Sequence, residues 1–405
     1  MADGISAARR MPPQRRGSIL VLSAGFSLTG AGTVMLGVLL PVLSQRWALR
    51  DDMAGLLLFL QFFGSALGAV FTGLNRIRSL MGGCALLAAS SCALAIAGLH
   101  TPFVAFFFFG LGLGMTMTST SLLFSDRWGD ERAAKLEWLN FAWSIGATTG
   151  PMLYLPFLHG SDVRALFLIW VGLSLLLLAW VGFRERREPR HLPELPPRPA
   201  MTVSLAFFLP LIILAMCAVG VEAALSGWLT TYSHRAGLRS LAGSAFATSL
   251  FFLGGLLSRL AFSTRLLARI GRNTTLLGAV WGVLASVTVL VAAPYPAVIL
   301  AVAGVAGLCI GPVYPLLLSY LLERSARGCI FAVGGLGAAF FPWLTGLLSA
   351  HLNSLRLGLI APCGAALLMV VLRTVAARTP DASGIAAPAH SWTGKLDAPA
   401  RRLHP

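Results

Sequence analysis

Charged side chains are scarce in this sequence. Only 11% of its 405 residues are Asp, Glu, Lys or Arg, whereas soluble proteins carry about 25%. That number is too small to cover the surface of two or three soluble domains, so an ordinary water-soluble enzyme is excluded. Hydrophobic residues make up 57% of the chain and its mean hydropathy is +0.79, which is typical of a protein that crosses a membrane many times.

Motifs of enzymes and metal sites are lacking as well. The six cysteines form no Cys-x-x-Cys pair and lie in or beside apolar segments, where they serve as small buried hydrophobic residues. We find no Walker loop, nucleophile elbow or metal-ligand cluster. The sequence therefore predicts no catalytic residue, no metal, no cofactor and no enzyme activity.

Twelve apolar runs are long enough to cross a bilayer, which takes about 20 residues of helix. They are 19–43, 54–75, 80–98, 102–124, 136–158, 164–183, 203–232, 243–264, 274–293, 296–322, 327–350 and 355–377. The first run has no signal-peptide cleavage site, so we expect it to be an uncleaved span. The predicted fold is an all-α membrane protein with twelve transmembrane helices.

Basic residues give the orientation of these spans. The chain has 31 Lys and Arg against 15 Asp and Glu, a net charge of +16. With the N-terminus in the cytoplasm, 25 basic residues lie on the cytoplasmic side and six outside: Arg46, Arg50, Arg164, Arg235, Arg239 and Arg356. This asymmetry predicts a multi-pass protein of the plasma membrane, a bacterial inner membrane, with both termini cytoplasmic. It also explains the net charge without nucleic acid as a partner.

The two halves of the chain repeat one another at an offset near 190 residues. The matches are Gly37 and Arg46 with Gly227 and Arg235, Phe62-Phe63 with Phe251-Phe252, and Ile145-Gly146-Ala147 with Leu336-Gly337-Ala338. We expect a cytoplasmic N-tail (1–18), a six-helix half (19–183), a proline-rich cytoplasmic linker (184–202), a second six-helix half (203–377) and a disordered cytoplasmic tail (378–405). Repeated halves with a site between them are a transporter architecture.

At this level the chain resembles the major facilitator superfamily. Asn75-Arg76-Ile77-Arg78 and 268–272 resemble degenerate copies of that family's loop signature, in which an acidic residue precedes the arginine. Gly220-Val221-Glu222, Gly227-Trp228-Leu229 and Thr231-Tyr232 resemble a pattern of the fucose-permease and sodium-dependent glucose transporter branch. The resemblance implies the major facilitator fold and sugar uptake by alternating access. The acidic residues of proton-coupled fucose permeases in spans one and four have no counterpart here.

Polar residues in mid-span are the candidate solute contacts. Glu222 is the only acidic residue well inside an apolar run, so we expect it to bind the coupling ion or a sugar hydroxyl. The amides of Gln61 and Asn140 can bind hydroxyl groups, and an aromatic ring can cover the apolar face of a sugar. The aromatic candidates are Trp143, Trp228 and Trp343. Helix packing is an equal alternative for Gln61, Asn140 and Trp143, and Trp228 and Tyr232 face either the cavity or the interfacial aromatic belt.

A cytoplasmic gate is a further hypothesis. Asp126, Arg127 and Arg259 can form it in place of the missing acidic residue of the loop signature. The alternative is that these are ordinary interfacial charges.

Three functions stay open. The first is symport of a small polar solute, a hexose-like sugar, with H⁺ or Na⁺ by a monomer in the lipid bilayer. The second is efflux of an amphipathic compound by proton antiport, suggested by Gly146-x3-Gly150-Pro151 and the 24 phenylalanines. The third is a receptor or scaffold that transports nothing.

The predicted orientation is tested by proteolysis. In intact cells or right-side-out vesicles, both termini and the 184–200 loop should be protected from added protease, because they lie in the cytoplasm. Cleavage of that loop from outside would contradict the orientation.

Overall fold

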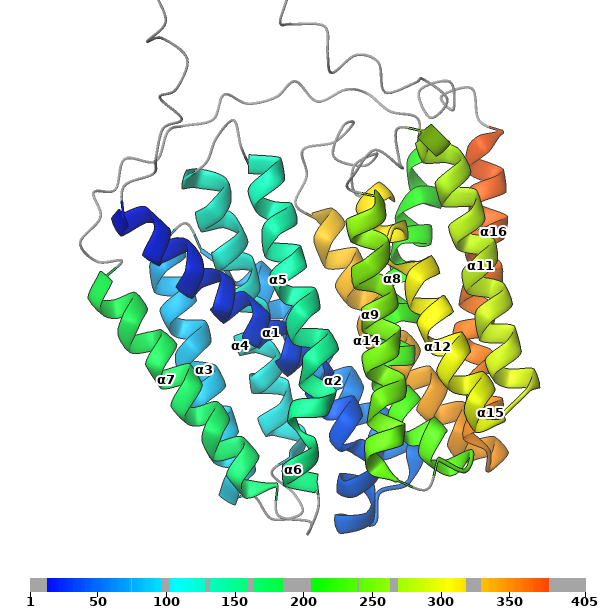
Figure 1. Ribbon diagram of the computed structural model, residues 1–405, viewed down its shortest axis with the longest axis horizontal. Coiled ribbons are helices and arrows are strands. Elements are labelled where there is room, and N and C mark those ends of the chain that lie inside the picture. Colours follow the sequence, from blue (N-terminus) through cyan, green and yellow to red (C-terminus); the bar gives the residue numbers. More distant parts are fainter. Residues whose placement is uncertain are drawn as a thin grey trace, which may run out of the picture.

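The computed structural model of the protein describes residues 13–73, 75–96, 102–127, 132–158, 163–184, 205–238, 240–262, 269–317 and 329–378. These residues form a bundle of helices (Figure 1) and contain no β-strand. In hydrocarbon every backbone N–H and C=O group must be bonded internally, and the α-helix does this within one segment.

Twelve long helices are present in the described part of the chain, as the sequence predicts. They are α1 (Pro13–Arg46), α2 (Asp51–Val70), α3 (Arg76–Ile96), α4 (Pro102–Arg127), α5 (Arg132–Leu153), α7 (Arg164–Arg184), α8 (Leu205–Arg235), α9 (Leu241–Phe262), α11 (Arg272–Ala292), α12 (Pro296–Ile310), α14 (Cys329–Leu352) and α16 (Ile360–Ala377). Eleven are long and apolar enough to cross a membrane when the α12 span is continued to Leu317 and the α16 span is begun at Leu355. The twelfth, α5, carries charged residues in its first two turns, which lower its hydropathy.

Two predicted spans are interrupted near the end opposite the termini. The run 136–158 is divided by a turn at Tyr154 into α5 and the single-turn α6 (Leu155–Leu158). The run 355–377 is divided at Leu359 into α15 (Leu355–Gly358) and α16. A proline lies close to each break, Pro151 and Pro362, and its missing N–H removes a helical hydrogen bond there.

The ends of α1 and α8 are built alike. Ala48 and Gly237 both have positive φ, 49° and 104°. The following amides close the same wide turn, Leu49 N–H to Ser44 O at 3.0 Å and Leu238 N–H to Ser233 O at 3.1 Å. This is the Schellman arrangement that ends a helix. The equivalent residues are 189 apart, so the internal repeat extends to backbone conformation.

Close backbone contacts repeat between the halves too. A Cβ atom on Gly110 of α4 would overlap the carbonyl oxygen of Gln61 in α2. A Cβ atom on Gly307 of α12 would overlap that of Phe251 in α9 in the same way. Glycine at these points lets the two helix axes approach closely, which is how membrane helices gain packing energy. The repeat therefore produces two helix pairs, α2–α4 and α9–α12, with the same contact.

The twelve helices assemble as two halves, α1 to α7 and α8 to α16 (Figure 1). Helices α3 and α7 pack together at one side and α11 and α16 at the other, while α1–α8, α2–α14 and α5–α9 join the halves. We name the end where α1 begins and α16 ends the terminal face, and the opposite end, with α6 and α15, the distal face. The predicted linker 184–202 lies outside the described residues apart from Arg184.

The close contacts predict the effect of adding one methyl group. Gly110→Ala and Gly307→Ala should both destabilise the protein by about 1–3 kcal/mol, because helix backbones must move apart. Gly278→Ala is the matched control, since a Cβ atom there meets nothing within 4 Å. Thermal unfolding of the purified variants measures the difference. Equal melting temperatures for Gly110→Ala and Gly278→Ala would refute the packing argument.

Candidate functional site

Arg259 is the centre of a polar cluster between the halves. It lies near the terminal end of α9, and its guanidinium reaches three other helices or their ends. Nη1 donates to Ser144 Oγ on α5 at 2.6 Å, Nη2 to Glu222 Oε1 on α8 at 3.4 Å, and Nε to the carbonyl oxygen of Gly311, after α12, at 3.5 Å. A guanidinium in a membrane protein needs such partners, because an isolated charge at that depth is costly.

Glu222 neutralises this charge from within the same half of the protein. It lies 13 residues before Arg235 on α8, which places it about 20 Å from the distal end of that helix. The side chains of Arg259 and Glu222 are 22% and 18% exposed, so neither is fully buried. Their separation of 3.4 Å is longer than the 2.7–2.9 Å of a strong charge-assisted hydrogen bond. The pair is therefore loose enough to exchange partners.

Trp143 forms an aromatic wall beside the pair. The Arg259 Cζ atom lies 5.7 Å from its ring centroid, within range of a cation–π interaction. Phe252 of α9 meets the same ring edge-on at 5.9 Å. The indole Nε1 is buried and has no hydrogen-bond partner among the described residues, although a buried N–H normally has one.

Asn140 lies one turn from Ser144 towards the terminal face. Its carbonyl oxygen accepts a hydrogen bond from Ser144 Oγ at 2.9 Å, and its side chain is exposed. Trp143, Glu222 and Arg259 thus come together with Ser144, a residue that the sequence did not single out, while Asn140 takes part through its backbone carbonyl group. Ser144 adjoins Trp143, but nothing in its sequence context marks it as an arginine partner.

Gln61 and Trp343 lie in other contacts. Gln61 is buried and donates from Nε2 to the carbonyl oxygen of Thr33 at 3.0 Å, linking α2 to α1; its Oε1 has no partner among the described residues. Trp343 of α14 packs edge-on against Phe59 of α2 with centroids 6.3 Å apart, across the junction of the halves. The hydrogen bond of Gln61 thus joins two helices, which is what the helix-packing alternative predicts.

Trp228 and Tyr232 are hydrogen-bonded to other helices of the second half. Trp228 is buried and its Nε1 donates to the carbonyl oxygen of Pro342 at 2.8 Å. Tyr232 is only 3% exposed and its hydroxyl donates to the carbonyl oxygen of Leu290, at the end of α11. Neither ring lies in an exposed interfacial belt, because each polar tip bonds to a neighbouring helix instead of to water.

Of the three residues of the hypothetical gate, the structure describes the side chain of Arg259 alone. The side chains of Asp126 and Arg127 lie outside the described residues, and the described partners of Arg259 are Ser144, Glu222 and Gly311. A gate of those three charges stays a prediction.

A second polar contact joins the halves at the distal face. Asp51, the first residue of α2, receives two hydrogen bonds from Arg235 of α8, both 2.7 Å, and a third from Ser349 of α14. Sequence analysis missed this contact. The available signal was an acidic pair, Asp51 and Asp52, placed directly before an apolar run on a side with few charges.

The fold has counterparts among solved structures of transporters. A bacterial homologue of the human lysosomal transporter Spinster, in an inward-facing and occupied conformation, aligns with a TM-score of 0.62 and 16% identity over 91% of this chain and 98% of that one. A D-xylose–proton symporter aligns with a TM-score of 0.66 and 16% identity over 88% and 97%. At this identity the likeness concerns the fold.

Comparison with curated protein sequences gives no significant match. The family model described as Major Facilitator Superfamily matches residues 22–330, about three quarters of the chain. Together with the twelve helices in two repeated halves, this match shows that the chain belongs to the Major Facilitator Superfamily.

Proposed function

We propose that this protein is a secondary transporter that carries a small polar solute, a hexose-like sugar, through the Arg259 cluster by alternating access with H⁺ or Na⁺. The observation that supports it best is the composition of the cluster. Side chains from both halves meet there, at a junction where a rocking motion of one half against the other would expose them to each side in turn.

The chemistry of the cluster suits a polyol. Arg259 and the indole N–H of Trp143 donate hydrogen bonds, and Glu222 accepts them. The Trp143 ring supplies a flat apolar surface. The unpartnered indole N–H favours a bound solute, because it regains a hydrogen bond there. A solved D-xylose–proton symporter shares the fold, which agrees with sugar as the solute class.

The long contact between Arg259 and Glu222 suggests how ion binding is coupled to solute binding. Protonation of Glu222, or a cation beside it, weakens its hold on Arg259, and the released Nη2 becomes free to bind a solute oxygen. Solute and ion then bind together, which is the requirement for symport. Efflux by proton antiport would instead require that the proton and the solute displace one another from the site.

Removing the indole N–H tests the sugar contact. Trp143→Phe keeps an aromatic ring but loses the donor, so it should raise the half-saturation concentration for the transported sugar about 3- to 10-fold, the value of one neutral hydrogen bond. Transport in proteoliposomes measures it. Trp138→Phe is the matched control on α5, since Trp138 is 47% exposed and its Nε1 already donates to Ser23. If the two variants have equal half-saturation concentrations, Trp143 serves in helix packing and does not bind the sugar.

Replacing the carboxylate tests coupling. Glu222→Gln keeps the shape but cannot ionise, so gradient-driven accumulation should be abolished while solute exchange across the membrane survives. Glu137→Gln, an exposed position on α5, is the control and should accumulate solute normally. Loss of accumulation and exchange together would make Glu222 a direct sugar ligand. Normal accumulation in Glu222→Gln would exclude it from coupling.

A further inference from the structure

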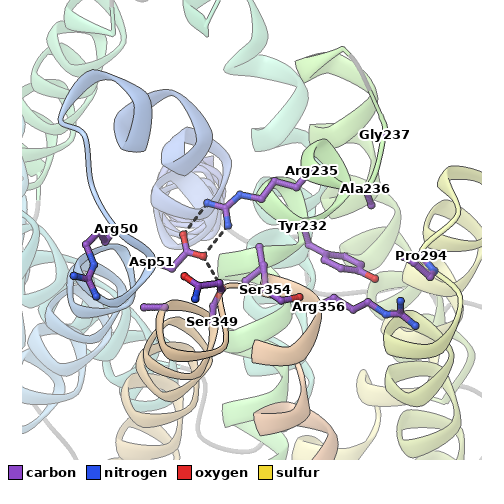
Figure 2. A pocket seen from close by; sticks show the side chains of 13 residues that line it. Arg50, Asp51, Tyr232, Arg235, Ala236, Gly237, Pro294, Ser349, Ser354 and Arg356 are labelled. Atoms are coloured by element: carbon purple, nitrogen blue, oxygen red, sulfur yellow. Dashed lines mark hydrogen bonds and ion pairs between the residues drawn. The ribbon is translucent and has the colours of Figure 1, made fainter.

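A cavity of about 1010 Å³ opens at the distal face, separate from the Arg259 cluster (Figure 2). Its wall comes from the start of α2, the end of α8, the segment from α14 to α15 and Pro294 between α11 and α12. Both halves of the protein contribute. Its volume is at the upper end of the range for small-molecule sites, about 300–1,000 Å³.

The wall is positively charged. Arg50, Arg235 and Arg356 line it against one carboxylate, Asp51. Figure 2 shows Arg50 on one side of the Asp51–Arg235 pair and Arg356 on the other. With the predicted orientation, only six basic residues lie on this side of the membrane, and three of them surround this cavity. The positive-inside bias disfavours that concentration, so it needs another cause.

Arg235 already binds the Asp51 carboxylate in the geometry that the carboxylate of a bound solute would adopt. Asp51 occupies both Nη1 and Nη2 at 2.7 Å, the bidentate arrangement of an arginine fork. Arg235 is 44% exposed and Asp51 12%, so a solute reaches the guanidinium. If Asp51 is displaced, its Oδ2 keeps the hydrogen bond from Ser349.

The other two arginines are not explained by the contact between the halves. Arg356 donates to the carbonyl oxygens of Val291 and Ala292, which holds its charge fixed on the wall. Arg50 is 75% exposed and lies 3.5 Å from Asp52, a weak surface pair. If the arginines served only to join the two halves by an ion pair with Asp51, Arg235 would be sufficient.

We propose that this cavity binds a small carboxylate-bearing solute, which takes the Arg235 guanidinium from Asp51 and thereby loosens the contact between the halves at the distal face. The proposal does not depend on the identity of the transported solute. Asp51 is an internal competitor for the site, so its removal should strengthen binding. A gain in affinity on removal of Asp51 distinguishes the proposal from a contact that only holds the halves together.

The probe is citrate, titrated into the purified full-length protein in phospholipid-free detergent at constant ionic strength, with binding measured by calorimetry. Citrate should bind, and more tightly than inorganic phosphate. Asp51→Asn should tighten citrate binding at least 3-fold. Arg235→Gln should weaken it about 10-fold or more, as expected for a charged hydrogen-bond pair. Arg164→Gln, on the same face but outside the cavity, should leave the affinity unchanged.

Hydrogen exchange supplies the second measurement. Citrate should accelerate amide exchange at the start of α2 in the unmodified protein, because the link to α8 is lost. The proposal is overturned if citrate does not bind, if phosphate binds as tightly, if Asp51→Asn weakens or leaves unchanged the citrate affinity, or if Arg164→Gln lowers it as much as Arg235→Gln. Because Asp51→Asn should gain affinity, a misfolded variant cannot imitate the expected result.

Discussion

Direct contact between helix backbones is the constraint on which the rest of this structure depends. Lipid is as apolar as the side chains it meets, so membrane helices gain little by hiding apolar surface and associate through close packing instead. Gly110 against Gln61, and Gly307 against Phe251, bring backbones together without an intervening side chain. The same contact recurs in each half. Gly37 of α1 against Ser226 of α8, and Gly346 of α14 against Asp51 of α2, bring backbones equally close between the halves.

The sequence predicted the fold well because its signals are local. Twelve apolar runs and the repeated order of residues depend only on neighbours along the chain, as does the isolated acid Glu222. The partners of the arginines could not be predicted. Ser144 is 115 residues from Arg259 and Asp51 is 184 from Arg235, so their meeting depends on the rotation and register of packed helices. Trp228 shows the same limit, because only the packing of α14 decides that its N–H meets a carbonyl group.

The two polar contacts have a common composition, and α8 takes part in both. At the distal face an arginine of α8 holds a carboxylate, which also receives a serine hydroxyl. In the Arg259 cluster an arginine of α9 holds a carboxylate and itself donates to a serine. The distances differ, since the distal pair is bidentate at 2.7 Å and the inner pair a single contact at 3.4 Å. The inner arginine therefore makes one short hydrogen bond, to Ser144, and two long ones, to Glu222 and Gly311, and the long ones leave it able to bind another partner.

The division of charge between the halves fits a protein that must open. Glu222 and Arg259 both belong to the second half, and from the first half the uncharged hydroxyl of Ser144 and ring of Trp143 reach Arg259. When the halves separate at this level, one hydrogen bond breaks and no charge loses its counter-ion in a region where an unpaired charge costs several kcal/mol. Asp51 and Arg235 belong to different halves and do lose each other on opening, but they lie at the distal end, where water stabilises separated charges. An ion pair within one half and an ion pair across both halves at the distal end keep the electrostatic cost of rocking low at each level.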